Sequence, residues 1–179
     1  MNYISANDYL KDAWRLAATV RKSGWRPDLL IALWRGGVTV GVALHEFFKV
    51  TGWNVEHLPL KCSSYTGIGQ TSGCVKFTHG DALFSEIKPG QRVLVVDDVF
   101  DTGTTAAAIS ERLAAIGAEM RFACVYWKRG NNKTTLSPDY FVSDPGDEWI
   151  VFPHEIEGLS REQIAEKDPM LEKLIADSW

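Results

Sequence analysis

The stretch from Arg92 to Gly117 constrains the fold of this chain more than any other. It opens with RVLVV, Arg92–Val96, a short apolar and β-branched run typical of a strand buried on both faces of a parallel sheet. Two acidic residues follow the strand, and the pattern over Thr104–Ile116 then predicts a helix that Gly117 ends. The inner face of that helix carries Ile109, Leu113 and Ile116. A buried strand that leads into a helix is typical of α/β domains.

The same alternation continues along most of the chain. Strands are predicted at Leu29–Leu33, Val55–Leu60 and Phe122–Trp127, and helices at Ser5–Lys22 and about Val38–Val50. Ser5 or Asn7 is a candidate cap for the first helix. Apolar residues recur in that helix at helical spacing, at Leu10, Ala13, Trp14, Ala17 and Val20. This order predicts an α/β fold with a mostly parallel central sheet flanked by helices.

Two parts of the chain depart from the alternation. The Gly/Ser/Thr-rich segment Cys62–Gly80 is predicted to be a long mobile loop. The tail is predicted to end in two short helices, one capped by Ser160 with Gln163 as its capping-box partner and one that begins at Asp168-Pro169. We expect a single domain over residues 1–179, with a core at about 1–140 and a small C-terminal hood at about 141–179 near the ligand-binding edge of the sheet.

Composition and charge argue against several classes of function. With 179 residues, 45% of them hydrophobic and 23% charged, the chain is long enough for one globular domain. Its net charge is −4 and no block of Lys or Arg stands out, so no nucleic-acid partner is expected. No apolar run is long enough to cross a bilayer and the polar start is unlike a signal peptide, so no membrane partner is expected. Three cysteines without a CxxC pair favour a reducing cytoplasm over disulfides or a zinc site.

The polar residues after Val96 are suited to bind a phosphorylated sugar. Ligands of open α/β sheets bind beyond the carboxyl ends of the strands. Asp97 and Asp98 suit vicinal ribose hydroxyls, directly or through a hard cation. Gly103 permits close approach of the backbone, and the N–H groups at the start of the helix favour a phosphate. Hydroxyl donors come from Thr102, Thr104 and Thr105. The plainer alternative is a solvated acidic turn in which Thr104 merely caps a helix.

The stretch Val93–Thr105 (VLVVDDVFDTGTT) closely resembles the phosphoribosyl pyrophosphate signature of type I phosphoribosyltransferases. The resemblance implies the type I phosphoribosyltransferase fold. It also implies that Asp97 and Asp98 bind the ribose 2′- and 3′-hydroxyls and that Asp101–Thr105 surround the 5′-phosphate. The family usually has a pyrophosphate loop after its first core strand, and Trp34-Arg35-Gly36-Gly37 follows Leu29–Leu33 here. In that loop, Arg35 can neutralise a phosphate, and Gly36 and Gly37 let backbone amides face it.

The last third of the chain resembles the 6-oxopurine branch of the family, the hypoxanthine, guanine and xanthine phosphoribosyltransferases of microbes. Lys128 would donate to the exocyclic oxygen of the base, Trp149 would stack on its ring, and the backbone of Trp149 and Ile150 would read its edge. Taken alone, a lysine at a strand end is usually solvated, and a tryptophan near apolar residues is usually core. The segment at about 62–80, with Ser64 and Tyr65, resembles the catalytic lid, and a surface loop without a role is the alternative.

The resemblance also implies a reaction. A purine N9 would displace pyrophosphate from C1 of the ribose, with Mg²⁺ as the cofactor. Asp101 would be the general base toward the purine N7 proton, while Lys128 polarises the 6-oxo group and Arg35 assists the leaving group. Asp97 and Asp98 are the candidate metal ligands, and Glu155 is the candidate for the second metal contact that relatives often take from an acid beyond the stacking aromatic. Phe100 stands where relatives usually carry a smaller or aliphatic residue, and could reshape the floor of the purine site.

Two alternatives remain open at this stage. One is a phosphoribosyltransferase for another base, adenine or a pyrimidine, although Lys128 argues against adenine, whose 6-amino group offers no acceptor. The other is a regulatory protein that binds phosphoribosyl pyrophosphate without catalysis, which would need a DNA- or RNA-binding element. The expected partners are phosphoribosyl pyrophosphate and a purine base. The protein itself is expected to be a cytoplasmic homodimer or homotetramer.

Overall fold

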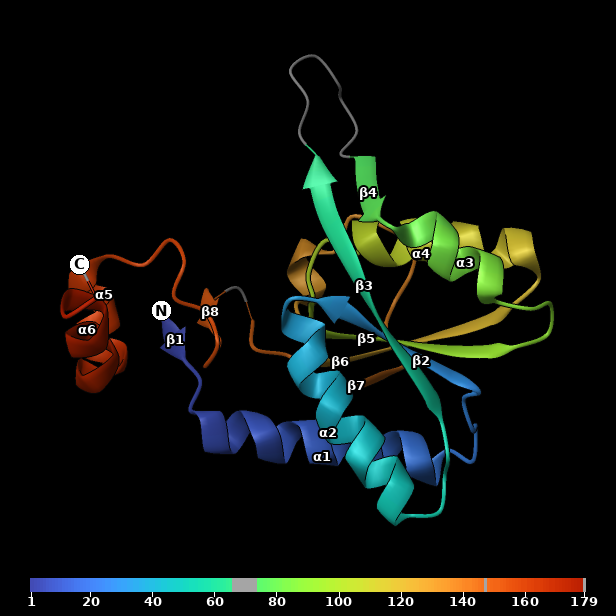
Figure 1. The fold of residues 1–179 in the computed structure, drawn as a ribbon, viewed down its shortest axis with the longest axis horizontal. Helices are drawn as coiled ribbons and strands as arrows, with labels where there is room; N and C mark the ends of the chain where they lie inside the picture. Colours follow the sequence, from blue (N-terminus) through green and yellow to red (C-terminus); the bar gives the residue numbers. More distant parts are fainter. Residues whose placement is uncertain (66–73, 147, 179) are drawn as a thin grey trace. The chain divides into compact units, whose positions relative to one another are not determined.

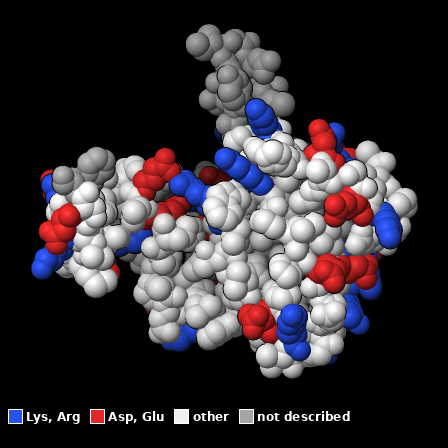
Figure 2. Space-filling view, in the orientation of Figure 1, with Lys and Arg blue, Asp and Glu red and all other residues white. Residues whose placement is uncertain are grey.

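The computed structural model describes residues 1–65, 74–146 and 148–178 (Figure 1). The chain forms two compact units, one of Leu10–Asp147 and one of Met1–Tyr9 with Glu148–Trp179. Among the described residues, no helix combines the length and the apolar character that a bilayer crossing needs. Lys and Arg side chains are interspersed with Asp and Glu on the face shown in Figure 2.

The larger unit is built on a six-stranded sheet with the order β4-β3-β2-β5-β6-β7. The pairs β2–β3, β2–β5, β5–β6 and β6–β7 are parallel, and the edge pair β3–β4 is antiparallel. The strands are β2 (Leu29–Trp34), β3 (Glu56–Tyr65), β4 (Cys74–Thr78), β5 (Arg92–Phe100), β6 (Glu119–Trp127) and β7 (Tyr140–Ser143). The predicted α/β class with a mostly parallel central sheet is thereby confirmed.

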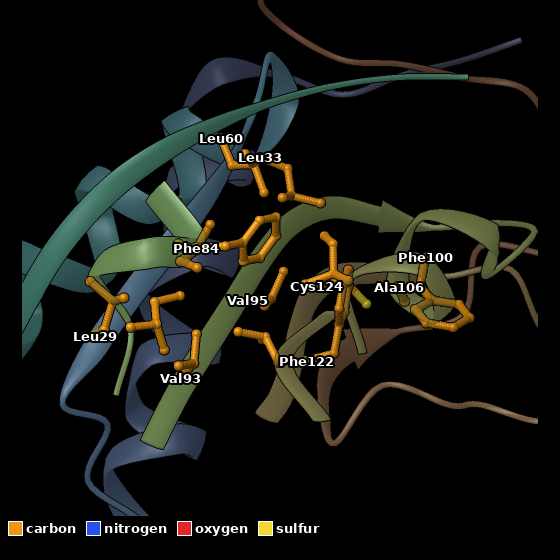
Figure 3. Packing of buried hydrophobic residues seen from close by; sticks show 14 residues of the cluster. Leu29, Leu33, Leu60, Phe84, Val93, Val95, Phe100, Ala106, Phe122 and Cys124 are labelled. Atoms are coloured by element: carbon orange, nitrogen blue, oxygen red, sulfur yellow. The ribbon is translucent and has the colours of Figure 1, made fainter. Parts of the chain in front are cut away.

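Helices cover both faces of this sheet, α1 (Ala6–Lys22) and α2 (Gly36–Val50) on one face and α3 (Gly80–Glu86) and α4 (Thr104–Ile116) on the other (Figure 1). The central strand β5 is buried on both faces, since Val93, Leu94, Val95 and Val96 are all fully buried. Figure 3 shows the core against α3 and α4, where Val93 and Val95 pack with side chains of the neighbouring strands. The predicted inner face of α4 is confirmed, with Ile109 and Leu113 fully buried, Ile116 packed against them, and Gly117 left-handed at the end.

The smaller unit pairs the two ends of the chain. Strand β1 (Asn2–Tyr3) lies parallel to β8 (Ile150–Val151), and helices α5 (Arg161–Lys167) and α6 (Pro169–Ala176) follow. Both predicted helix starts are confirmed, because Ser160 and Gln163 form a capping box and the Asp168 carboxylate accepts from the N–H of Met170 at 2.8 Å. The arrangement of hood and core as one domain stays a prediction.

The predicted strand Arg92–Val96 ends too early. Strand β5 continues to Phe100 because β6 pairs with it as far as Phe100 and Trp127, so the two acidic residues lie inside the strand. The prediction of a loop over Cys62–Gly80 is wrong at both ends, because β3 and β4 pair from Lys61 and Thr78 to Tyr65 and Cys74. Residues 66–73 of that segment lie outside the described residues.

Smaller differences concern the helices. The Oγ of Ser5 accepts from the N–H of Asp8 at 3.1 Å, so Ser5 caps α1 as predicted. In the predicted apolar face of α1, Leu10 and Trp14 are exposed, and Leu16 is buried instead beside Ala13, Ala17 and Val20. The sequence interpretation missed β1, α3 and the short 3-10 helix η1 (Arg129–Asn131).

Candidate active site

The candidate site lies where the order of the strands reverses. Strand β2 has β3 on one side and β5 on the other, and the chain builds the sheet outward in both directions from this pair. The loops after the carboxyl ends of two such strands diverge and leave a crevice, which is the usual ligand site of open α/β sheets. Arg35 follows β2, Gly36 and Gly37 are the first residues of α2, and Asp97 and Asp98 lie near the carboxyl end of β5.

The two glycines at the start of α2 pack directly on β5 near its carboxyl end. A side chain at Gly36 would overlap the carboxylate of Asp98, and one at Gly37 would overlap the carbonyl oxygen of Val96. Only residues without a Cβ atom permit this approach to the Asp98 side chain and the Val96 backbone. Arg35 is exposed and stands at the N-cap position of α2, just before the two glycines. The two sequence motifs are therefore parts of one site.

Two carboxylates meet in this crevice. The Asp97 carboxylate accepts from the N–H of Asp98 at 3.0 Å, and that of Asp98 accepts from the N–H of Val99 at 2.7 Å. Burial, and then the neighbouring charge of Asp98, raise the pKa of Asp97 well above its ordinary value, while hydrogen bonds from the backbone of Asp98 and Gly37 act in the opposite direction. A cation or a pair of sugar hydroxyls at this position would favour the charged form.

The loop Asp101–Thr105, which we call the phosphate loop, joins β5 to the start of α4. Gly103 adopts a left-handed conformation (φ 78°), and the hydroxyls of Thr102 and Thr104 lie 2.9 Å apart. The first N–H groups of α4 have no partner within the helix, so the loop can bind an anion. A pocket beside it is lined by Asp97, Val99, Phe100, Asp101, Thr102, Gly103, Thr105, Ala106 and Phe122.

Asp101 contributes a third acidic group to the site. Its Oδ1 atom is buried and has no hydrogen-bond partner among the described residues. A buried carboxylate oxygen without a partner is costly, so such an atom is poised to accept a hydrogen bond from a ligand.

Lys128 lies at the end of β6 and is 7% exposed, so it is not the solvated strand-end lysine of the plainer interpretation. Its N–H donates to the carbonyl oxygen of Phe100 at 2.9 Å, which holds the predicted base-binding lysine next to the residue that precedes the phosphate loop. Phe100 is buried against Phe122 and Trp127 in edge-to-face contacts and also lines the pocket.

The remaining predicted residues lie in the smaller unit or in β3. Trp149 is 65% exposed, which excludes a core role within its unit, and its carbonyl oxygen accepts from the N–H of Asn2. Ile150 is buried, and Glu155 accepts from the N–H of Phe152. All three belong to the smaller unit, so their roles stay predictions. Ser64 and Tyr65 lie in β3 opposite Val75 and Cys74, and their role in a lid also stays a prediction.

Among the described residues no cluster of three or more His, Cys, Asp or Glu side chains forms a metal site. The pair Asp97 and Asp98 still fits Mg²⁺, which is usually bound by one or two carboxylates, substrate phosphates and water. Burial, and then the charge of Asp97, raise the pKa of the Cys62 thiol to about 12, so the thiol stays protonated and is unsuited to act as a nucleophile.

Sequence reasoning missed a polar segment that packs on the phosphate loop. The side chains of Asn132 and Thr134 lie against Gly103, and the N–H of Lys133 donates to the carbonyl oxygen of Thr102 at 2.9 Å. The polar residues that follow Lys128 were the available signal, but their partners lie about thirty positions earlier in the chain.

Comparison with known proteins agrees with this geometry. A model of the phosphoribosyl transferase domain matches residues 4–160. The chain belongs to the phosphoribosyltransferase family. Its fold is the type I phosphoribosyltransferase fold, and a crystal structure of a purine phosphoribosyltransferase from Pyrococcus horikoshii matches it with a TM-score of 0.68 and 28% identity, over 88% of this chain and 95% of that one. The family and fold inferred from Val93–Thr105 are confirmed.

Curated relatives include hypoxanthine/guanine phosphoribosyltransferases. That of Methanocella arvoryzae is 27% identical over 121 residues, which cover 68% of this chain and 62% of the relative. The chain thus spans less than two thirds of the length of this relative. A hypothetical protein from Neisseria gonorrhoeae with bound ppGpp shares the fold, with a TM-score of 0.75 and 22% identity over 97% of both chains. The predicted resemblance to the 6-oxopurine members of the phosphoribosyltransferase family is confirmed, because the relatives that match this chain are named as such enzymes.

Proposed function

We propose that this phosphoribosyltransferase moves the 5-phosphoribosyl group from phosphoribosyl pyrophosphate to N9 of guanine, hypoxanthine or xanthine, in purine salvage. The observation that carries the proposal is the contact of Gly36 and Gly37 with the end of β5, next to the phosphate loop. This contact brings the segment proposed to bind pyrophosphate against the carboxylate pair, and the loop proposed to bind the 5′-phosphate follows that pair in the chain. A solvated acidic turn would need none of these close approaches.

The residues divide the transfer step between them. The bond from C1 of the ribose to a pyrophosphate oxygen breaks and the bond from C1 to N9 forms, with positive charge on the sugar in between. The carboxylates of Asp97 and Asp98 would stabilise that charge, and Arg35 with the amides of Gly36 and Gly37 would stabilise the departing pyrophosphate. Bound Mg²⁺, held by Asp97 and Asp98 together with substrate oxygens, would supply further charge neutralisation.

Asp101 and Lys128 would act on the base. The buried Oδ1 of Asp101 would accept the proton that leaves the purine at N7, and the Lys128 ammonium would donate to the 6-oxo oxygen. A 6-amino group offers no acceptor to this lysine, which favours a 6-oxopurine over adenine. Trp149 as a stacking residue, Ile150 as a reader of the base edge and Glu155 as a further metal ligand are proposed on the resemblance alone. The oligomeric state and the cytoplasmic location of the protein likewise stay predictions.

One assay tests the proposal. The protein is incubated with phosphoribosyl pyrophosphate, Mg²⁺ and, separately, guanine, hypoxanthine, xanthine, adenine and uracil, and the nucleotide formed is measured. We expect turnover with at least one 6-oxopurine and its loss when EDTA removes the metal. Turnover with adenine or uracil alone would replace the proposed substrate class. Binding of phosphoribosyl pyrophosphate, or of the ppGpp seen in the gonococcal protein, without turnover would favour a regulatory protein.

Asp101→Asn separates binding from catalysis. The amide keeps the size of the carboxylate but cannot take a proton, so we expect turnover to fall by about 100-fold or more. The dissociation constant for phosphoribosyl pyrophosphate should change far less. Equal losses in both quantities would remove Asp101 from the role of base.

A further inference from the structure

The segment after η1 contains a closed cluster of hydrogen bonds. Oδ1 of Asn132 accepts from the N–H and the hydroxyl of Thr134, at 2.9 and 3.0 Å, and Nδ2 of Asn132 donates to the carbonyl oxygen of Leu136 at 2.7 Å. The Thr134 hydroxyl in turn accepts from the N–H of Leu136 at 3.3 Å. We call residues 132–136 the brace. Side chains that bond to nearby backbone in this way fix a loop that has no strand or helix to support it.

The brace contacts the phosphate loop at its most restricted point. A Cβ atom at Gly103 would lie 2.5 Å from Oγ1 of Thr134 and 2.9 Å from Oδ1 of Asn132, so both polar side chains rest on the glycine. The N–H of Lys133, between them, donates to the carbonyl oxygen of Thr102. The brace therefore supports the backbone that leads into the first amides of α4.

Lys128, which precedes the brace in the chain, holds Phe100 on the other side of Asp101. The N–H of Lys128 donates to the carbonyl oxygen of Phe100, and that of Lys133 donates to the carbonyl oxygen of Thr102, each at 2.9 Å. Both neighbours of Asp101 are thus held by residues 128–133. This support explains how Oδ1 of Asp101 stays buried without a partner, because a free loop would relax to let the carboxylate reach water.

We propose that Asn132 and Thr134 are positioning residues that hold the phosphate loop in the conformation that binds the 5′-phosphate of phosphoribosyl pyrophosphate. The proposal rests on the proposed function for the identity of the ligand. Neither side chain needs to touch the substrate, since both act through Gly103 and Thr102. Loss of their hydrogen bonds should therefore weaken binding of the phosphoribosyl donor while leaving binding of the purine nearly unchanged.

Variants at Thr134 test the role of its hydroxyl. Thr134→Val removes the hydroxyl at nearly the same shape, and Thr134→Ser keeps it. Thr135→Val makes the same change at an exposed neighbour. We expect Thr134→Val to raise KM for phosphoribosyl pyrophosphate about tenfold, which corresponds to about 1.4 kcal/mol of binding free energy. KM for the purine should change less than about twofold, and the other two variants should match the parent. Asn132→Ala should follow Thr134→Val, with Asn131→Ala as its control.

Amide hydrogen exchange supplies a readout that does not depend on activity. The amide of Lys133 reports the bond to Thr102, and the amide of Ala107 reports the first turn of α4 through its bond to Gly103. Faster exchange at both amides in Thr134→Val, but not in Thr135→Val, would support the brace. Unchanged exchange together with an unchanged KM for the donor would overturn it, and so would equal losses for donor and purine. If the parent protein binds no phosphoribosyl pyrophosphate, the proposed function fails, and the exchange measurement decides on the brace by itself.

Discussion

Gly103 and Gly90 form a matched pair for measuring how tightly the phosphate loop is packed. Both glycines have φ of +78°, so alanine meets the same backbone strain at each. At Gly90 the new Cβ atom would have nothing within 4 Å, whereas at Gly103 it would meet Thr134 and Asn132 and lie 3.1 Å from Cε1 of Phe100. The two alanine variants therefore differ in packing alone.

The magnitudes follow from these distances. Left-handed backbone costs an alanine about 1 kcal/mol, so Gly90→Ala should lower Tm by roughly 2–4 °C. Gly103→Ala adds an overpacking cost of about 1–3 kcal/mol, which makes its Tm loss roughly two to four times as large. If the loop moves instead, the 2.5 Å contact must open to about 3.4 Å, and a shift near 1 Å at a binding site can cost up to about 100-fold.

Thermal unfolding and titration with phosphoribosyl pyrophosphate check both outcomes. We expect Gly90→Ala to bind the ligand like the parent protein, and Gly103→Ala to bind at least about tenfold more weakly or to unfold well below Gly90→Ala. Equal Tm values and equal affinities for the two variants would show that the loop has room for a side chain. That result would refute the close packing of Asn132 and Thr134 on Gly103.

Three further predictions concern charge, the base and the smaller unit. The pKa of Asp97 is raised in the folded state, so the contribution of this carboxyl group to stability is present at acid pH and is lost as pH rises through that pKa. In EDTA, Asp97→Asn should therefore gain Tm over the parent increasingly from pH 5 to pH 8. An equal gain at both pH values would contradict this. Lys128→Met should lower turnover with a 6-oxopurine by about 100-fold, while Lys88→Met, at an exposed lysine, should not, as steady-state kinetics can show. Ser160→Ala removes the capping box of α5 and should destabilise the smaller unit by about 1 kcal/mol, visible as faster amide exchange at Gln163, whereas parent-like exchange there would count against the cap.

Local sequence patterns predicted most of the helices and the central strands of the sheet, because the burial of each of these elements determines the spacing of its own apolar residues. The β-branched run at Val93–Val96 and the spacing of Ile109 and Leu113 describe faces that the structure buries. The ends of strands were harder, because pairing with a neighbour decides them. Strand β5 reaches Phe100 only because β6 continues beside it, and β3 reaches Tyr65 because β4 pairs with it. Neither partner can be recognised from the residues of the strand itself.

The residues of the site were also predictable from local motifs, whereas their contacts with distant parts of the chain were not. Asp97, Gly103 and the glycines after β2 belong to short motifs in which each residue type has its own physical purpose. The contact between the two motifs follows from topology, since β2 and β5 are neighbours only because the strand order reverses there. The packing of Asn132 on Gly103 depends on the path of the chain after β6, and a polar run gives no sign of which loop it will meet.

This long-range support bears on how the two halves of the proposed reaction are connected. Residues 128–133 begin with the lysine proposed to read the base and end with the amide that holds the phosphate loop. This short segment makes a separate hydrogen bond at each end, from the N–H of Lys128 to Phe100 and from the N–H of Lys133 to Thr102. The residues on both sides of Asp101 are therefore held by one segment, and loss of the support at Thr102 leaves the hydrogen bond that places the Lys128 backbone. An aspartate that must accept a proton from a base, next to a loop that must hold the sugar phosphate, needs this kind of shared support, because an error of about 1 Å at either point would separate the base from C1 of the ribose.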